Sequence, residues 1–157
     1  GVGGHCISVD PWFLVGDYPD LTNLILTARK INDSMPTHVL GRIRDIMREH
    51  NITDISKIGI YGLAYKENVD DTRESPTLQL LERMDEHLAF GVKVYDPFIK
   101  ERMVDHQFMN FEDFINEIEI LVIITAHDHI KNNLDLIKDK LILDTKNICS
   151  FDGVYKL

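Results

Sequence analysis

Apolar residues recur every three or four positions along residues 20–50, from Leu21 to Met47. This spacing places them on one face of an α-helix, so the segment predicts one long helix or two helices in sequence. Asp20 can cap the start, and Pro36 should bend or break the helix because proline lacks a backbone N–H. An apolar stripe of this length has to be buried, either on the chain's own core or against another domain or subunit.

From Lys57 onward, short apolar runs alternate with stretches of helical spacing. Short β-rich runs separated by helices predict a parallel sheet with helices on both faces, which is a Rossmann-like α/β fold. The chain therefore divides near residue 52, into a helical region at 1–52 and a Rossmann-like domain at 53–157. The expected strands are 58–63, 92–95, 120–125 and 141–144, and the expected helices are 76–87 and 112–116.

Ser75 and Pro76 form a strong helix start. Serine is a good N-cap, and proline suits the first helical position because its missing N–H is not needed there. In the helix that follows, Leu78, Leu81 and Met84 are expected to face the sheet.

Polar and aromatic residues follow the ends of several predicted strands. Ligands of parallel sheets bind outside the carboxyl ends of the strands, so these residues are expected to line a common cleft. They are Tyr65, Lys66, Asp96, the loop from His127 to His129, and Lys146.

Composition excludes several classes of function. A net charge of −9 over 157 residues argues against a nucleic-acid partner, and the sequence has no apolar run of membrane-spanning length. Cys6 and Cys149 are too few for a disulfide framework, which favours a reduced, cytoplasmic setting with Cys149 structural. His127 and His129 lack further ligands nearby, so no metal site is expected.

The first residues form a glycine-rich loop that presents Cys6, with Asp10 four residues later. A thiol in such a loop suits covalent chemistry on a carbonyl, although a lone cysteine beside glycines is also a common small apolar filler. Asp10 is expected to orient groups or assist a water, with capping of the next helix as its rival. His5 should point away from Cys6, because adjacent side chains diverge in an extended loop.

The run GVGGHCISVDPWF closely resembles the cysteine motif of the UDP-glucose/GDP-mannose dehydrogenase family. A second block, Gly62 to Lys66 followed by Asp70 to Pro76, is similar to the motif that begins the family's C-terminal domain. The residues around the cysteine look most like the branch that acts on UDP-N-acetylmannosamine, ahead of UDP-N-acetylglucosamine, UDP-N-acetylgalactosamine and UDP-glucose. The chain also starts inside the first motif, so it is interpreted as a fragment.

The resemblance implies oxidation of a sugar C6 alcohol to a carboxylate with two NAD⁺. Cys6 would capture the intermediate aldehyde as a thiohemiacetal, which then becomes a thioester that water hydrolyses. The connection after Gly59 lacks the dinucleotide fingerprint, so NAD is expected mainly on an N-terminal domain absent from this chain. The fragment alone is therefore expected to be inactive.

The resemblance also assigns binding roles. Tyr65 would stack on the uracil, Lys66 would reach the sugar or the diphosphate, and Gly3 would let the substrate approach the backbone. Arg73 would reach across to the cofactor, and Lys146 stands where many members have a substrate-contacting arginine. The alternatives are a packed Tyr65, a solvated Lys66, and an Arg73 that pairs with Asp70, Asp71 or Glu74.

The expected partners are a UDP-sugar, the missing NAD-binding domain and a second copy of the chain, with a homodimer formed through residues 20–50. A second hypothesis is a non-catalytic module that binds UDP and dimerises. A third, a response-regulator-like signalling domain, requires an acidic pocket at the end of the first strand, whereas that strand ends in Gly-Leu-Ala-Tyr-Lys.

Overall fold

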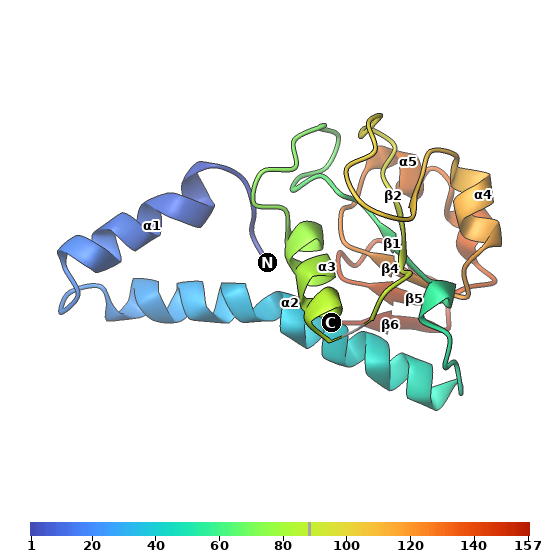
Figure 1. Cartoon of the computed structure of the whole chain (residues 1–157), viewed down its shortest axis with the longest axis horizontal. Helices are drawn as coiled ribbons and strands as arrows, with labels where there is room; N and C mark the ends of the chain where they lie inside the picture. Colours follow the sequence, from blue (N-terminus) through green and yellow to red (C-terminus); the bar gives the residue numbers. More distant parts are fainter. Residues whose placement is uncertain (88) are drawn as a thin grey trace.

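The computed structural model describes residues 1–87 and 89–157. Two helices precede a sheet region in which strands and helices alternate (Figure 1). Short 3-10 turns occupy Ile55–Lys57 and Leu134–Ile137. The helices are α1 (Cys6–Asp17), α2 (Asn23–Glu49), α3 (Pro76–Glu86), α4 (Phe111–Asn116) and α5 (Asp128–Lys131), and the strands are β1 (Ile58–Tyr61), β2 (Lys93–Tyr95), β3 (Gln107–Phe108), β4 (Ile120–Ile123), β5 (Leu141–Asp144) and β6 (Val154–Lys156).

The six strands form one parallel sheet in the order β3-β2-β1-β4-β5-β6. Ile60 in the centre of the sheet pairs with Val94 on one side and Val122 on the other. The predicted Rossmann-like α/β fold is confirmed, with the four expected strands at β1, β2, β4 and β5. The edge strands β3 and β6 and the helices α1 and α5 were not expected from the sequence.

Side chains alternate between the two faces of the central strands, as the period of a β-strand requires. Ile58 and Ile60 pack with α2 and α3 on one face. Tyr61 and Leu121 pack on the other face, with the aromatic residues of α4 and with Ile130 of α5. Helices therefore cover both faces, and the carboxyl ends of the strands form one edge of the domain (Figure 1).

The long helix α2 is continuous, and it begins later than expected. Its N-cap is Thr22, so the prediction that Asp20 caps it is wrong. Pro36 lies inside the helix, which changes direction about halfway along (Figure 1). Proline thus bends this helix without breaking it, because its ring removes one backbone hydrogen bond and crowds the preceding turn.

Helix α3 begins as the sequence predicts. The Ser75 hydroxyl oxygen accepts a hydrogen bond from the backbone N–H of Thr77, and Pro76 is the first helical residue. Met84 is buried against the sheet as expected. Leu78 and Leu81 are only partly buried, and Leu80 takes the fully buried position instead.

The two halves of α2 have different surroundings. Val39, Leu40, Ile43 and Ile46 belong to the core between α2, α3 and the sheet. Residues 6–35, which we call the N-terminal arm, comprise α1 and the first half of α2 and extend away from the sheet (Figure 1). Large apolar side chains are exposed along this arm, namely Ile7, Trp12, Phe13, Leu14, Tyr18, Leu21, Leu24 and Ile31.

The close contact between β1 and α4 gives a stability test. A Cβ atom on Gly59 would lie 2.6 Å from Ile118 Cδ1 and 2.7 Å from Phe114 Cζ, in the densely packed core. Gly59→Ala is expected to destabilise the fold by about 1–3 kcal/mol in urea unfolding, because overpacking forces neighbouring side chains to shift.

Gly41 in α2 is the matched control, since a Cβ atom there meets nothing within 4 Å. Gly41→Ala is expected to stabilise the fold by up to about 1 kcal/mol through its higher helix propensity. Equal effects of the two substitutions would contradict this account of the packing.

Candidate functional site

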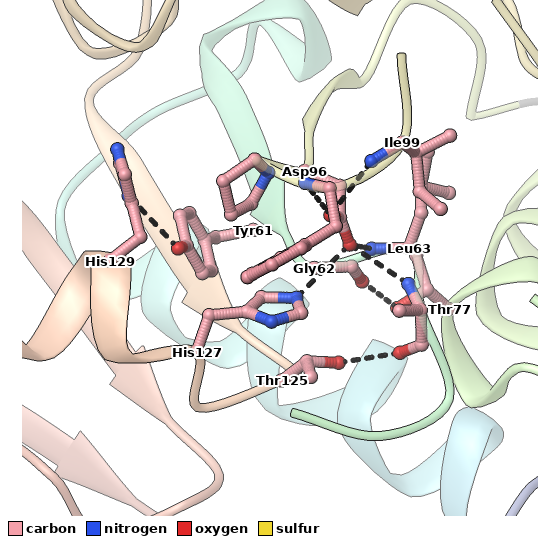
Figure 2. Close-up of polar contacts among 12 residues, drawn as sticks. Tyr61, Gly62, Leu63, Thr77, Asp96, Ile99, Thr125, His127 and His129 are labelled. Carbon is pink, nitrogen blue, oxygen red and sulfur yellow. Dashed lines mark hydrogen bonds and ion pairs between the residues drawn. The ribbon is translucent and has the colours of Figure 1, made fainter. Parts of the chain in front are cut away.

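The segment after β1 is held by hydrogen bonds to every backbone carbonyl from Gly62 to Ala64. The hydroxyl groups of three side chains donate to these carbonyls: Ser75 to Leu63 and, as Figure 2 shows, Thr77 to Gly62 and Thr125 to Ala64. Gly62 has φ +100°, and a Cβ atom there would lie 2.5 Å from Thr125 Cβ, so this turn requires glycine.

Asp96, the residue after β2, holds the N–H groups of the same segment. Its buried Oδ2 accepts hydrogen bonds from Leu63 N at 2.7 Å and from Ala64 N at 2.9 Å, and Oδ1 accepts one from Phe98 N at 2.8 Å (Figure 2). Burial raises the pKa of this carboxyl group, but hydrogen bonds from His127 and these backbone groups outweigh burial and lower it overall.

His127 is fully buried beside Asp96, with its two ring nitrogens engaged. Nδ1 accepts a hydrogen bond from the backbone N–H of Asn68 at 2.9 Å. Nε2 lies 3.2 Å from Asp96 Oδ2, as Figure 2 shows. A backbone N–H can only donate, so these partners assign a neutral ring with its proton on Nε2. Asp96 and His127 are therefore buried beneath the loop, and the prediction that they line a common cleft with the other residues at the strand ends is wrong.

The glycine loop at the N-terminus packs directly on Tyr65. A Cβ atom on Gly3 would lie 2.3 Å from the Glu74 carbonyl oxygen and 2.8 Å from Tyr65 Cβ. A Cβ atom on Gly4, which has φ +95°, would lie 2.9 Å from Tyr65 Cε2, and the Gly4 N–H donates to the Arg73 carbonyl at 3.0 Å. The glycines thus allow this loop to lie against the β1–α3 connection.

Cys6 is the first residue of α1, so the glycine-rich loop ends before it. Its Sγ lies 3.7 Å from His5 Nδ1, because His5 already has helical backbone angles. The expectation that these side chains diverge is wrong. Asp10 lies inside α1 and caps no helix, and its spacing of four places it on the same helix face as Cys6, one turn further on.

Arg73 is paired with Asp71, one of the carboxylates suggested by the sequence. Arg73 Nη2 lies 2.6 Å from Asp71 Oδ2, and Nε also donates to this carboxylate. These hydrogen bonds lower the pKa of Asp71 to about 2. Arg73 remains exposed on the surface beside the cysteine loop.

Lys146 follows β5, where a second buried carboxylate organises the chain. Asp144 accepts hydrogen bonds from Lys146 N at 2.9 Å, Cys149 N at 2.8 Å and Lys156 Nζ at 2.8 Å. The exposed Lys146 lines a cavity of about 140 Å³ together with Gly1. Burial and the nearby Asp144 raise the pKa of Cys149 to about 11, as suits a structural thiol.

Sequence reasoning missed the polar residues that support the site: Asn68, Thr77, Thr125 and the pairing of Asp96 with His127. The available signal was the polar residues near the strand ends, such as Asp96 directly after β2 and His127 four residues after β4, which were interpreted as ligand contacts. The structure brings Gly3, Tyr65 and Arg73 together, and it places Lys66 on the exposed surface of the same connection.

Residues 59–151 match the UDP binding domain of the UDP-glucose/GDP-mannose dehydrogenase family. The chain belongs to this family. A UDP-N-acetyl-D-mannosamine dehydrogenase from Methanocaldococcus jannaschii is 41% identical over 156 residues, covering 94% of this chain and 35% of that protein. An NDP-N-acetyl-D-galactosaminuronic acid dehydrogenase from Ralstonia nicotianae is 34% identical, covering 96% of this chain and 36% of that protein.

A solved structure shows the same fold as this UDP-glucose/GDP-mannose dehydrogenase family chain. It is a UDP-D-ManNAc dehydrogenase from Pyrococcus horikoshii, with a TM-score of 0.83, 30% identity, and coverage of 99% of this chain and 38% of that one. The chain thus spans about a third of the length of the curated relatives named above.

Residues 1–87 and 89–157 contain no group of three or more histidine, cysteine and acidic side chains placed to hold a metal ion. His129, the second histidine considered as a ligand, bonds to the Tyr61 hydroxyl through Nδ1 at 3.1 Å. No helix within this part of the chain has both the length and the apolar character needed to cross a membrane.

The buried carboxylate of Asp144 gives a pH test. Burial raises its pKa, but hydrogen bonds from Lys156 and two backbone groups lower it overall. Because the folded pKa lies below the unfolded value of about 4, this stabilisation is complete above that pH and is lost as pH falls through the folded pKa. Asp144→Asn is expected to cost about 1–3 kcal/mol in urea unfolding at pH 7 and to flatten the loss of stability in acid.

The control is Asp135→Asn, because Asp135 pairs with Lys138 on the exposed surface. This substitution is expected to leave stability nearly unchanged, as is usual for exposed ion pairs. If the free energy of unfolding falls by the same amount in acid for the wild type and for Asp144→Asn, the role of Asp144 is contradicted.

Proposed function

We propose that this chain is the C-terminal, UDP-sugar-binding part of an NAD-dependent nucleotide-sugar 6-dehydrogenase. The observation that carries the proposal is the docking of the cysteine loop on the UDP-binding domain. The Gly4 N–H binds the Arg73 carbonyl at 3.0 Å, and Gly3 and Gly4 contact Tyr65. This packing holds Cys6 next to the connection that carries Tyr65, Lys66 and Arg73.

Cys6 is the proposed nucleophile. Its sulfur adds to the carbonyl carbon of the sugar aldehyde, and the carbonyl oxygen gains a proton to give a thiohemiacetal. NAD⁺, when bound, supplies the acceptor for the hydrides that leave the substrate. Once the thiohemiacetal carbon is oxidised, water cleaves the resulting thioester and returns the thiol. Asp10, one turn from Cys6, is proposed to orient or activate this water.

The chain does not offer the usual Rossmann site for a dinucleotide. In that site, backbone N–H groups at the end of the first strand hold the pyrophosphate. Here the N–H groups of Leu63 and Ala64 bind Asp96. We therefore assign NAD to the part of the enzyme that lies outside this chain, with Arg73 reaching across to it.

The proposed substrate is UDP-N-acetylmannosamine. Support comes from the relatives named for this sugar, at 41% and 30% identity. Tyr65 is assigned to the uracil, Lys66 to the sugar or diphosphate, and Gly3 and Lys146 to further substrate contacts. The other UDP-sugars remain alternatives, since a relative at 34% identity is named for a galactosaminuronic acid. The setting proposed for the reaction is the cytoplasm.

A second candidate function is a non-catalytic module that binds UDP and dimerises. The N-terminal arm favours this possibility, because Leu21 and Leu24 are 84% and 82% exposed. Burying large apolar side chains is strongly favourable, so a second subunit or the NAD-binding domain is expected to cover this surface.

Calorimetric titration of this chain with UDP and with NAD⁺ tests the proposed function. UDP is expected to bind and NAD⁺ is not. Lys66→Ala is expected to weaken UDP binding by at least about tenfold, because a charge-assisted hydrogen bond is lost. The exposed Lys138 supplies the control, since Lys138→Ala should leave the affinity unchanged. Tight binding of NAD⁺ alone would contradict the assignment.

Sedimentation velocity tests the proposed homodimer. The wild-type chain is expected to sediment as a dimer, and Leu24→Asp is expected to shift it to a monomer because a charge would be buried in the contact. Leu136→Asp is the control, since Leu136 is exposed on a turn far from the arm in sequence. If the wild-type chain stays monomeric at high concentration, the homodimer is contradicted, and the NAD-binding domain is the expected cover of the arm instead.

A further inference from the structure

Residues 62–75, which we call the nucleotide loop, connect β1 to α3 and carry Tyr65, Lys66 and Arg73. The proposed nucleotide contacts therefore lie on a connection without regular secondary structure. A lysine side chain has high rotamer entropy, so a binding role requires that the backbone beneath it be fixed. Two buried residues outside the loop supply this support.

Asp96 fixes the start of the nucleotide loop. Its Oδ2 accepts the N–H groups of Leu63 and Ala64, while Oδ1 accepts those of Phe98 and Ile99 in its own turn (Figure 2). The Asp96 side chain is completely buried, so water cannot replace these bonds without opening the structure.

His127 fixes the middle of the nucleotide loop. Its Nδ1 accepts the N–H of Asn68, which has a left-handed backbone at φ +59°. The Asn68 side chain in turn bonds to Asp128, which donates its backbone N–H at 2.9 Å. The same histidine ring is bound to Asp96 through Nε2, so both attachment points share one buried unit.

We propose that Asp96 and His127 are positioning residues for nucleotide binding, because together they hold both ends of the segment 65–67. Ala64 precedes this segment and is bound to Asp96, and Asn68 follows it and is bound to His127. Lys66 is thereby two residues from either attachment. This inference rests on the proposed function, in which Tyr65 and Lys66 bind the nucleotide.

Two substitutions separate the two bonds of the histidine. The amide oxygen of His127→Asn lies close to the position of Nδ1, so it can still accept the Asn68 N–H but cannot reach Asp96. The longer His127→Gln places its amide near Nε2, so it can bind Asp96 but offers no acceptor to Asn68. His129→Gln is the matched control, because His129 bonds to Tyr61 in the core and not to the nucleotide loop.

The experiment measures amide hydrogen exchange and UDP affinity on the same samples. In His127→Gln, the amides of residues 65–68 are expected to exchange about threefold to tenfold faster, with UDP binding weakened by a similar factor, as expected for one lost hydrogen bond. His127→Asn is expected to show smaller changes in both. His129→Gln is expected to change neither measurement at temperatures well below its unfolding.

Unchanged exchange in His127→Gln would overturn the proposal, as would faster exchange with unchanged UDP affinity. If the wild-type chain binds no UDP, the proposed function fails, and the proposed role in nucleotide binding fails with it, while exchange still reports whether the pair holds the loop. If the variants do not fold, a measurement on the wild-type chain still tests the proposal. Nitrogen NMR should show a scalar coupling between the Asn68 amide nitrogen and His127 Nδ1, and a protonated Nδ1 would overturn the proposal.

Discussion

The carboxylate of Asp96 is the constraint on which the segment after β1, at the carboxyl ends of the strands, depends. A buried charge is costly unless several donors surround it, and this one receives N–H groups from Leu63, Ala64 and its own turn, together with His127. In a dinucleotide-binding domain the corresponding N–H groups would face a pyrophosphate. Here the protein's own anion binds them, and the proposed nucleotide contacts are side chains further along the connection.

The same solution recurs at the end of β5. Asp144 is buried and accepts hydrogen bonds from backbone N–H groups of the turn that carries Lys146, and the Lys156 ammonium group balances its charge. The two carboxylates turn the ends of β2 and β5 into fixed supports, whereas Lys66 and Lys146 are exposed above them. Buried carboxylates thus support the segments that carry the exposed Lys66 and Lys146, which are the lysines proposed to contact the anionic substrate.

Sequence patterns predicted those parts of the fold that are set by local rules. The continuous apolar runs at β1 and β4 are typical of strands buried on both faces, and Ser75 with Pro76 marked the start of α3. The edge strands β3 and β6 have only two and three residues, too few for a periodic signal. The roles of Asp96 and His127 depend on contacts across 31 positions or more, which no local pattern contains.

Helix α1 was missed for a related reason. Its apolar residues surround the helix, and Ser8 is its one buried residue, so no stripe marks a buried face. An isolated helix of 12 residues is marginal in water, which means that contacts hold this one in place. At its start these contacts are the glycine loop against Tyr65 and Arg73, on the loop fixed by Asp96 and His127. The proposed nucleophile begins α1, so the loop that precedes the thiol packs on the same connection that the buried pair holds.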